Sequence, residues 1–252
     1  MSMVKHLKKE EQQIELLFDG AFTENKPIPF PNKNGTQAYS NLFYWAHLVA
    51  HETSEFPLHP HEGFEIITFI FKGSLEHYDT ASKVYTPLNA GDVQAIQAGS
   101  GVSHSERIIK GTEMFQIWFD PDFSKTMKQD ATYKDYTLED FHKKEDTGLE
   151  VLTYVGKDGN VESVTEGLEI KKTSYKRGEF TEEIDLEFTY SFYLLNGKVV
   201  LNGDTLLKDD FYVLKDANRV ALSVKEDAEL FVVRTPTDVK YARFIERYKK
   251  GK

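Results

Sequence analysis

Short segments rich in β-branched and aromatic residues recur along this sequence and limit the folds open to it. Four are clear: residues 64–71 (FEIITFIF), 112–119 (TEMFQIWF), 190–195 (YSFYLL) and 229–235 (ELFVVRT), each bounded by Gly, Asp, Asn or Pro. Such segments are typical of β-strands. Short strands at close spacing favour a β-barrel or a β-sandwich, so we expect a mainly β protein.

The two halves of the chain share a weak repeat. FIFKGSLEHYD, LNAGDVQAIQAGSGVSHSE and MFQIWF in the first half correspond to YLLNGKVVLNGD, LLKDDFYVLKDANRVALSV and LFVVRT in the second. This order of strands and turns predicts two similar β-domains, with the repeated segments at roughly 35–120 and 150–235 and a polar connector between them. We expect domain bounds of 1–130 and 131–252.

Helical periodicity is clear only near the end of the chain. Tyr241, Phe244, Ile245 and Tyr248 recur at i, i+3, i+4 and i+7. The pattern predicts a short C-terminal helix whose apolar stripe covers a face of the sheets, and a helix that binds a partner is the alternative.

Composition argues against several classes of function. The formal net charge of −10 argues against binding of nucleic acid through its phosphates. The absence of cysteine excludes disulfides, thiolate catalysis and zinc–sulfur sites. The N-terminal residues lack the apolar region of a signal peptide, and no apolar run approaches the roughly 18 residues of a membrane span. We expect a cytoplasmic protein that binds neither nucleic acid nor membrane.

Two histidine motifs in the first half suggest a metal site. In HPHEGFE (59–65), His59 and His61 would share one face of a strand, and strand parity allows Glu65 to share it too. His104 and Glu106 repeat the same spacing in GSGVSHSE. Facing strands could bring three imidazoles and a carboxylate to one point, and this donor set suits Fe(II), Mn, Ni, Cu or Zn. A lone HxH motif is more often a surface or hydrogen-bonded pair. The metal-site hypothesis therefore depends on the combination of His59 and His61 with His104 and Glu106.

Other histidines carry less information. We expect His77, in LEHYD, on a strand surface or at a barrel rim, and the spacing of His47 and His51 indicates nothing because their neighbours are strand-like. No histidine follows His142. In the repeat, Leu222 and Val224 fall near the positions that match His104 and Glu106, so any metal chemistry should belong to the first half.

HPHEGFEIITFIFKGSLEHYD and AGDVQAIQAGSGVSHSE together resemble the two defining motifs of pirins, which are bicupin members of the cupin superfamily. The resemblance is strong over about residues 55–120 and weaker beyond. It implies a bicupin fold of two tandem cupin (jelly-roll) β-barrels. It also implies a divalent metal in the first barrel, held by His59, His61, His104 and Glu106, and a second barrel without ligands. Fe(II) is expected, with Ni, Mn, Co, Cu or Zn as alternatives.

Most cupins take their carboxylate ligand from the first motif, which here would be Glu65. HSE is the pirin form, so Glu106 is the expected ligand, and Glu65 would orient a ligand imidazole or a bound molecule. A salt-linked structural role for Glu65 is the alternative. The sequence departs from pirins at Glu62, where an arginine is common, and at Ala95, where a bulky residue is common. Parity points Glu62 away from the metal, so we expect ligation to survive while the charge at the barrel edge is reversed.

Several pirins resemble quercetin 2,3-dioxygenases, which implies a metal-dependent enzyme that opens a flavonol ring with O2. Glu106 would accept the 3-hydroxyl proton. Phe64, Phe69, Phe71 and Tyr78 are candidates to wall the substrate pocket or to pack in the core. The alternative from other family members is a non-enzymatic regulator whose metal redox state controls binding to a protein partner. An open cavity at the ligands would favour the enzyme, and no motif supports a third class, a cupin isomerase or sugar-binding module.

Overall fold

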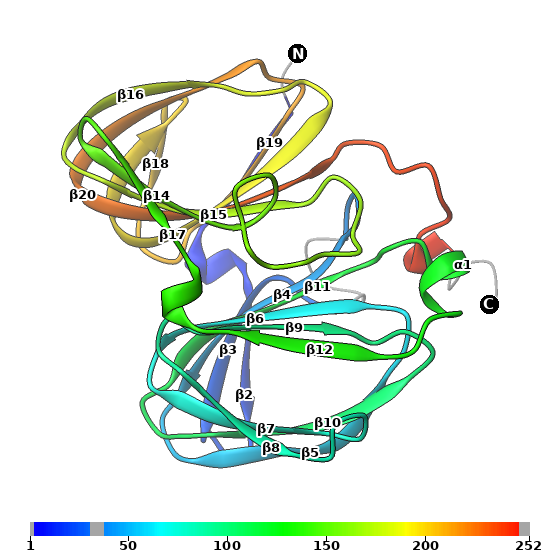
Figure 1. Cartoon of the computed structure of the whole chain (residues 1–252). Coiled ribbons are helices and arrows are strands. Elements are labelled where there is room, and N and C mark those ends of the chain that lie inside the picture. Colours follow the sequence, from blue (N-terminus) through cyan, green and yellow to red (C-terminus); the bar gives the residue numbers. More distant parts are fainter. Residues whose placement is uncertain (1–2, 31–37, 247–252) are drawn as a thin grey trace. The chain divides into compact units, whose positions relative to one another are not determined.

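The computed structural model describes residues 3–30 and 38–246 and is mainly β, which confirms the predicted fold class (Figure 1). Its residues form two compact units, here called the first and the second barrel. The first barrel comprises the described residues of Gln13–Asp140, Ser163–Thr165 and Lys240–Lys252, and the second comprises those of Met1–Gln12, Phe141–Glu162 and Glu166–Val239. The bounds expected from the sequence, 1–130 and 131–252, cut the chain once, whereas each unit draws on three segments.

The first barrel contains two sheets. The seven-stranded sheet has the order β12-β9-β6-β11-β4-β3-β2, and the four-stranded sheet has the order β5-β10-β7-β8. The strands of the larger sheet are β2 (Gln13–Leu17), β3 (Phe22–Ile28), β4 (Leu42–Ala50), β6 (Glu65–Lys72), β9 (Val93–Gln97), β11 (Glu113–Phe119) and β12 (Thr132–Tyr136). The strands of the smaller sheet are β5 (Ser54–His61), β7 (Ser74–Asp79), β8 (Tyr85–Asn89) and β10 (Val102–Ile108).

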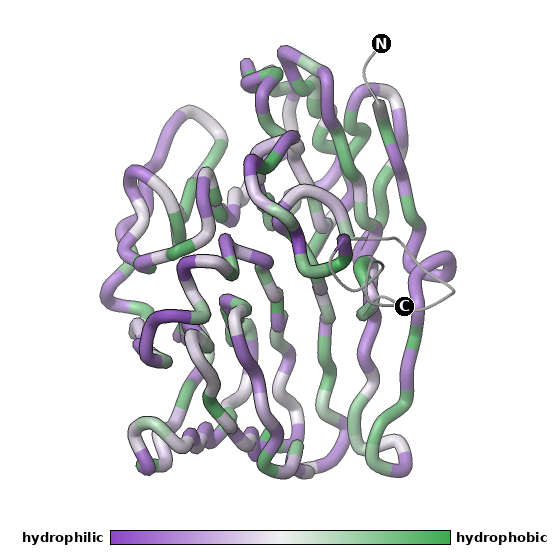
Figure 2. Tube along the Cα trace, turned by 90° about the vertical axis from the view of Figure 1, so that its right-hand side faces the viewer, coloured by the Kyte–Doolittle hydropathy of each residue, from purple (hydrophilic) through white to green (hydrophobic). Residues whose placement is uncertain are grey.

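The inner faces of these two sheets pack against each other. Buried and partly exposed residues alternate along β7, as expected for a strand with one face in a core. Figure 2 shows hydrophilic and hydrophobic stretches interspersed along the trace. One buried cluster combines apolar side chains of both sheets: Phe22, Leu48, Ile70 and Met114 from the larger, and Leu75, Leu88 and Ile108 from the smaller. Burying each such side chain stabilises the fold by about 1.5–3 kcal/mol.

The described helices are short. They are α1 (Phe123–Thr126), two 3-10 turns, η1 (Lys9–Glu11) and η2 (Leu138–Asp140), and a helical stretch at 244–246. None in the described part of the chain is long and apolar enough to cross a membrane. The Phe244 ring packs 5.4 Å from that of Phe43 and 5.1 Å from that of Phe64. The predicted stripe therefore does cover an apolar surface of the first barrel, although Tyr248 lies outside the described residues.

The second barrel is built on one nine-stranded sheet. Its main path is β1-β19-β17-β20-β15-β14-β13, with β16 paired to β20 and β18 to β17. The strands are β1 (Met3–Leu7), β13 (Lys143–Asp146), β14 (Leu149–Val155), β15 (Glu169–Tyr175), β16 (Gly178–Glu183), β17 (Phe188–Leu201), β18 (Asp204–Leu206), β19 (Phe211–Lys215) and β20 (Arg219–Pro236). Its core is apolar and includes Leu222 and Val224.

The strand pairings of the two barrels correspond. In the first, β9 pairs with β6 on one side and with β12 on the other, and in the second β19 pairs with β17 and with β1. The long strand β20 takes the places of both β10 and β11. The repeat seen in the sequence is thus a repeat of structure. Because β1 is the second barrel's counterpart of β12, the N-terminal residues belong to that barrel.

Candidate metal centre

Three histidines converge on the inner side of the four-stranded sheet. His104 of β10 lies opposite His59 of β5, and His61 follows two residues along β5. One ring nitrogen of each lies within 4.8 Å of those of the other two, and Nε2 of His61 is 3.0 Å from Nε2 of His104. Two nitrogens bound to one ion at about 2.1 Å and at right angles are about 3.0 Å apart, so this spacing fits a shared metal ion.

The local sequence of β5 helps to orient these rings. Pro57 and Pro60 lack a backbone N–H, and β5 is an edge strand, where proline is tolerated. The Nδ1 of His59 lies 2.8 Å from the carbonyl oxygen of Pro57. A carbonyl can only accept, so Nδ1 carries the proton and Nε2 keeps its lone pair for a metal.

Burial and crowding keep two of the imidazoles neutral. The pKa of His61 is lowered to about 3 by burial and by the neighbouring rings of His104 and His59. Burial and the rings of His59 and His77 lower the pKa of His104 to about 3. Neutral imidazole is the form that binds metal, so protons do not compete for these nitrogens near neutral pH. The cluster fits a transition-metal ion in spacing, tautomer and charge.

Glu106 is not among the residues whose ligand atoms lie within 4.8 Å of one another. Glu106 is 2% exposed, and its Oε1 and Oε2 accept hydrogen bonds from Nε2 of Gln116 at 3.0 and 3.1 Å. The pairing of β10 with β5 shifts register between His104 and Glu106, whereas the pairing of β10 with β7 is regular through both residues. The structure brings together three of the four predicted ligands. The role of Glu106 as the fourth stays a prediction.

Gln116 also connects Glu106 to an aromatic wall of the cluster. Its Oε1 accepts a hydrogen bond from Nε1 of Trp118 at 3.0 Å. The Trp118 ring stands edge-on to the imidazole of His61, with centroids 4.7 Å apart. Neither Gln116 nor Trp118 belongs to the histidine motifs. The sequence pattern that could have identified Gln116 is TEMFQIWF, where a polar Gln lies between apolar residues of a buried strand.

The structure corrects the role expected for Glu65. Its carboxylate is fully buried and accepts hydrogen bonds from the hydroxyls of Ser163 and Thr165, both at 2.6 Å, and from the Val164 backbone N–H at 3.0 Å. These contacts give Glu65 a structural role that is neither metal ligation, nor orientation of an imidazole, nor a salt link. Burial raises the pKa of Glu65, and the hydrogen bonds oppose that shift.

The expected surface position of His77 is also wrong. Its exposure is 0%, because β7 turns this residue toward the inside of the barrel. Its ring lies 5.4 Å from that of His104, centroid to centroid. Burial lowers the pKa of His77, against the opposing effect of the carboxylates of Glu106 and Asp79, so the ring is neutral near pH 7. The spacing of LEHYD, with Leu75 and His77 on one face, was the available signal.

A pocket of about 470 Å³ opens at the cluster. It is lined by Pro60, His61, Glu62, Thr80, Gly101, Val102 and Ser103. This volume lies within the roughly 300–1,000 Å³ typical of small-molecule sites. Glu62 is exposed and lines this pocket together with His61. The aromatic residues considered as pocket walls are elsewhere: Phe64 and Phe69 are core residues, Phe71 packs on Phe115, and Tyr78 packs on Tyr85.

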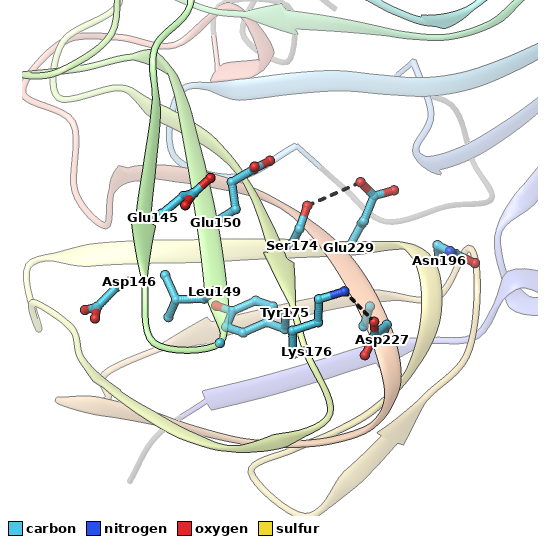
Figure 3. Close-up of a pocket in the computed structure, with 12 residues that line it drawn as sticks. Glu145, Asp146, Leu149, Glu150, Ser174, Tyr175, Lys176, Asn196, Asp227 and Glu229 are labelled. Atoms are coloured by element: carbon cyan, nitrogen blue, oxygen red, sulfur yellow. Dashed lines mark hydrogen bonds and ion pairs between the residues drawn. The ribbon is translucent and has the colours of Figure 1, made fainter.

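The second barrel has a different character. Leu222 pairs with Phe180 at the place where His104 pairs with His59 in the first barrel, and apolar side chains fill that interior. A pocket of about 430 Å³ lies among β13, β14, β15 and β20 (Figure 3). No histidine lines it, and Asp227 there is paired with Nζ of Lys176 at 2.8 Å. Within residues 3–30 and 38–246, no second group of three potential ligands lies as close together as the histidine cluster.

Comparisons with known proteins agree with this architecture. The family model described as Pirin matches residues 30–119. A pirin-like protein of Caulobacter vibrioides is 32% identical over 184 residues, covering 71% of this chain and 76% of that protein. The quercetin 2,3-dioxygenase of Escherichia coli K12 is 26% identical over 186 residues, with 72% and 76% covered. The crystal structure of the E. coli pirin YhhW in complex with nickel(II) superposes with a TM-score of 0.78 at 22% identity, covering 94% of this chain and 100% of that one. The fold, the histidine cluster and the sequence similarity lead to one conclusion: this chain belongs to the pirin family.

Proposed function

We propose that this chain is a metal-dependent dioxygenase of the quercetin 2,3-dioxygenase type, with His59, His61, His104 and Glu106 as metal ligands. The observation that carries the proposal is the pocket of about 470 Å³, which has one of the three clustered imidazoles, His61, in its lining. A site that serves only to hold a metal needs no such opening. The similarity to the E. coli enzyme named quercetin 2,3-dioxygenase supports the choice of a flavonol as substrate.

The reaction begins with removal of the flavonol 3-hydroxyl proton. An Fe(II) or Ni(II) ion bound to the imidazoles would supply Lewis-acid chemistry that makes this hydroxyl more acidic. Glu106 accepts the proton, and Gln116, which donates to both of its oxygens, positions it. The deprotonated flavonol then reacts with O2, and its ring opens to a depside with loss of CO.

The pocket supplies orientation and apolar contact. Pro60 and Val102 offer apolar surface to the aromatic rings of a flavonol, and the Trp118 ring packs edge-on against His61. The His59 ring cannot rotate without breaking its bond to the Pro57 carbonyl, so its Nε2 stays aimed at the cluster. These contacts reduce the reorganisation that substrate binding requires.

The alternative, a regulator that changes its affinity for a protein partner with the metal's redox state, predicts metal binding without turnover. The open pocket favours the enzyme. Glu62, which lines the pocket, places a negative charge on this face.

Oxygen uptake with quercetin tests the proposal. The purified chain is loaded with iron or nickel and followed with an oxygen electrode while depside formation is measured. We expect turnover in the wild-type protein and its loss in His59→Ala and His104→Ala. His51→Ala is the matched control, because His51 is exposed and lies outside the cluster, and it should keep full activity.

A lack of turnover by wild-type protein loaded in turn with iron, nickel, cobalt, copper and manganese would reject the enzymatic proposal. The regulatory alternative would then be the better account, provided that the metal still binds.

A further inference from the structure

His77 is a fully buried imidazole that has no hydrogen-bond partner among the described residues. Both of its ring nitrogens are inaccessible to solvent and unpaired. The nearest acid on its own strand, Asp79, has its Oδ2 3.9 Å from Nδ1 of His77, which is too long for a hydrogen bond. The Asp79 carboxylate is instead engaged by the backbone N–H groups of Ala81 and Ser82 and by the Ser82 hydroxyl.

An unpaired buried polar group costs about 1–3 kcal/mol. Leucine or valine would fill this position without that cost, as Leu75 does two residues earlier on the same face. Because His77 makes no hydrogen bond that stabilises the fold, we expect its role to be an interaction with a neighbouring functional group.

The neighbour directly across the sheet is Glu106. In the pairing of β10 with β7, Glu106 lies opposite His77, and His104 lies opposite Asp79. Side chains that face each other in this way have Cβ atoms about 4.5–5.5 Å apart and lie on the same side of the sheet. The charge of Glu106 acts on the His77 ring. Glu106 thus accepts from the Gln116 amide and lies across the sheet from an imidazole whose nitrogens have no hydrogen-bond partner.

We propose that His77 is a positioning residue that donates a hydrogen bond to the Glu106 carboxylate when Glu106 serves as a metal ligand. A neutral imidazole has one N–H to donate, and a carboxylate has two oxygens, so one oxygen can bind the metal while the other accepts from His77. Residues that orient ligands in this way commonly change metal affinity by about 10–100-fold. The inference rests on the ligand set assigned under the proposed function, but not on the identity of the substrate.

Cobalt(II) binding to the metal-free full-length protein tests this inference. Affinity is measured by calorimetry, and the visible absorption of bound cobalt reports its coordination. His77→Leu removes both nitrogens at similar volume, and we expect it to weaken Co²⁺ binding about 10-fold or more and to shift the cobalt bands as Glu106→Ala does. His77→Gln keeps an N–H donor and should restore part of the affinity.

A double-mutant cycle separates positioning from direct ligation. If His77 acts through Glu106, His77→Leu changes Co²⁺ affinity by less than about 2-fold in the Glu106→Ala background. An equal loss in both backgrounds, or unchanged affinity of His77→Leu in the wild-type background, would refute the proposal. The matched control is His47→Leu, because His47 is a buried histidine of the same barrel, 4% exposed, whose Nε2 lies 3.0 Å from Glu113 Oε1.

The stability of the metal-free protein distinguishes positioning from a structural role. Replacing an unpaired buried imidazole by leucine should leave the thermal midpoint unchanged or raise it. A lowered midpoint, with no recovery of Co²⁺ affinity in His77→Gln, would show a structural role instead. These measurements need no substrate, so an inactive protein that still shows the Glu106-dependent effect would reject the dioxygenase proposal alone.

Discussion

A proton on the ring of His61 or His104 would place a positive charge in a largely buried site beside further imidazoles. The lowered pKa values of His61 and His104 express this cost. The same arrangement is favourable for a cation that all three nitrogens can share. These imidazoles therefore bind a metal ion in preference to protons near neutral pH.

Glu65 provides a test of how the buried carboxylate affects stability. Its pKa is raised in the folded state by burial, so between the ordinary value near 4.5 and the folded value the native protein binds more protons than the unfolded chain. Stability from this group is therefore present at low pH and lost as the pH rises through that window. We expect the free energy of unfolding of wild-type protein, relative to Glu65→Gln, to fall by up to about 1.4 kcal/mol per pH unit.

Urea unfolding at several pH values from 4.5 upward measures this difference. Glu76→Gln is a suitable control, because the Glu76 side chain is 46% exposed. A difference between wild type and Glu65→Gln that rises with pH would show that the three hydrogen bonds outweigh burial.

Sequence reasoning placed the histidines better than the acids. The i, i+2 spacing sufficed for His59 and His61 because both lie on one strand and point to one side. Glu65 could not be placed, because its hydrogen-bond donors lie about 100 residues further along the chain. The environment of His77 depends on the pairing of β7 with β10, which no local pattern encodes.

Two glycines at equivalent turns of the two barrels shape their strands. Gly73 separates β6 from β7. Gly197 lies within β17, at the position that corresponds to Gly73 when the two halves of the chain are aligned. Both have positive φ, 75° and 85°. A Cβ at Gly73 would lie 2.7 Å from Cα of Thr112, and one at Gly197 would lie 2.8 Å from Cα of Ala228. Backbone crowding adds to the conformational cost at both.

Gly73→Ala and Gly197→Ala should each lower the free energy of unfolding by roughly 2–4 kcal/mol, from left-handed strain plus overpacking. Gly203→Ala is the control, with φ 99° and no atom within 4 Å of the place its methyl group would occupy, and should cost only the strain of about 1–2 kcal/mol. Both tryptophans, Trp45 and Trp118, belong to the first barrel. Tryptophan fluorescence should therefore report Gly73→Ala, and circular dichroism both substitutions. An equal loss of unfolding free energy in Gly73→Ala, Gly197→Ala and Gly203→Ala would show that backbone crowding contributes nothing.

The strands were predictable where apolar runs end at turns, and the alignment of the two halves followed from those turns. The register shift within β10 was not predictable, because a bulge arises from competition between the pairings on the two sides of a strand. Residues 219–236 form a single strand where the first barrel has two, β10 and β11, and the sequence suggested a separate strand only for its last part.

For the molecule as a whole, the assignment of Met1–Gln12 to the second barrel is the main departure from the sequence-based division. The segment MVKHL is only five residues long, and nothing in its sequence indicates which strand it pairs with. Its place is fixed by β1 pairing with β19 and by contacts of the turn that follows: Lys9 Nζ lies 2.6 Å from Oδ2 of Asp209, and Gln12 Nε2 donates to the Asp209 carbonyl at 2.7 Å.

Removing residues 1–12 should destabilise the second barrel and leave the histidine cluster of the first barrel intact. The deletion leaves the backbone of β19 unpaired on one side, which costs hydrogen bonds and exposes an edge that favours self-association. We expect a lower unfolding midpoint by circular dichroism and more oligomer by size-exclusion chromatography. The tryptophan transition and the Co²⁺ affinity should stay close to wild type.

The double substitution Lys9→Ala and Gln12→Ala provides a milder control, because it keeps β1 while removing two side-chain contacts of the turn. Loss of Co²⁺ binding on deletion of residues 1–12 would contradict the independence of the two barrels that this prediction assumes.

The pairing of β1 with β19 also sets an order of events during synthesis. About 200 residues separate Leu7 from its partner Phe211, which at about 5–20 residues per second is roughly 10–40 s of translation. β1 remains without its partner strand during this interval, while the strands of the first barrel up to its edge strand β12 emerge and can pair with one another. A nascent chain that stalls before residue 211 would thus carry the histidine cluster of the first barrel, would lack the packing of Phe244 on Phe43 and Phe64, and would expose β1 without its partner strand.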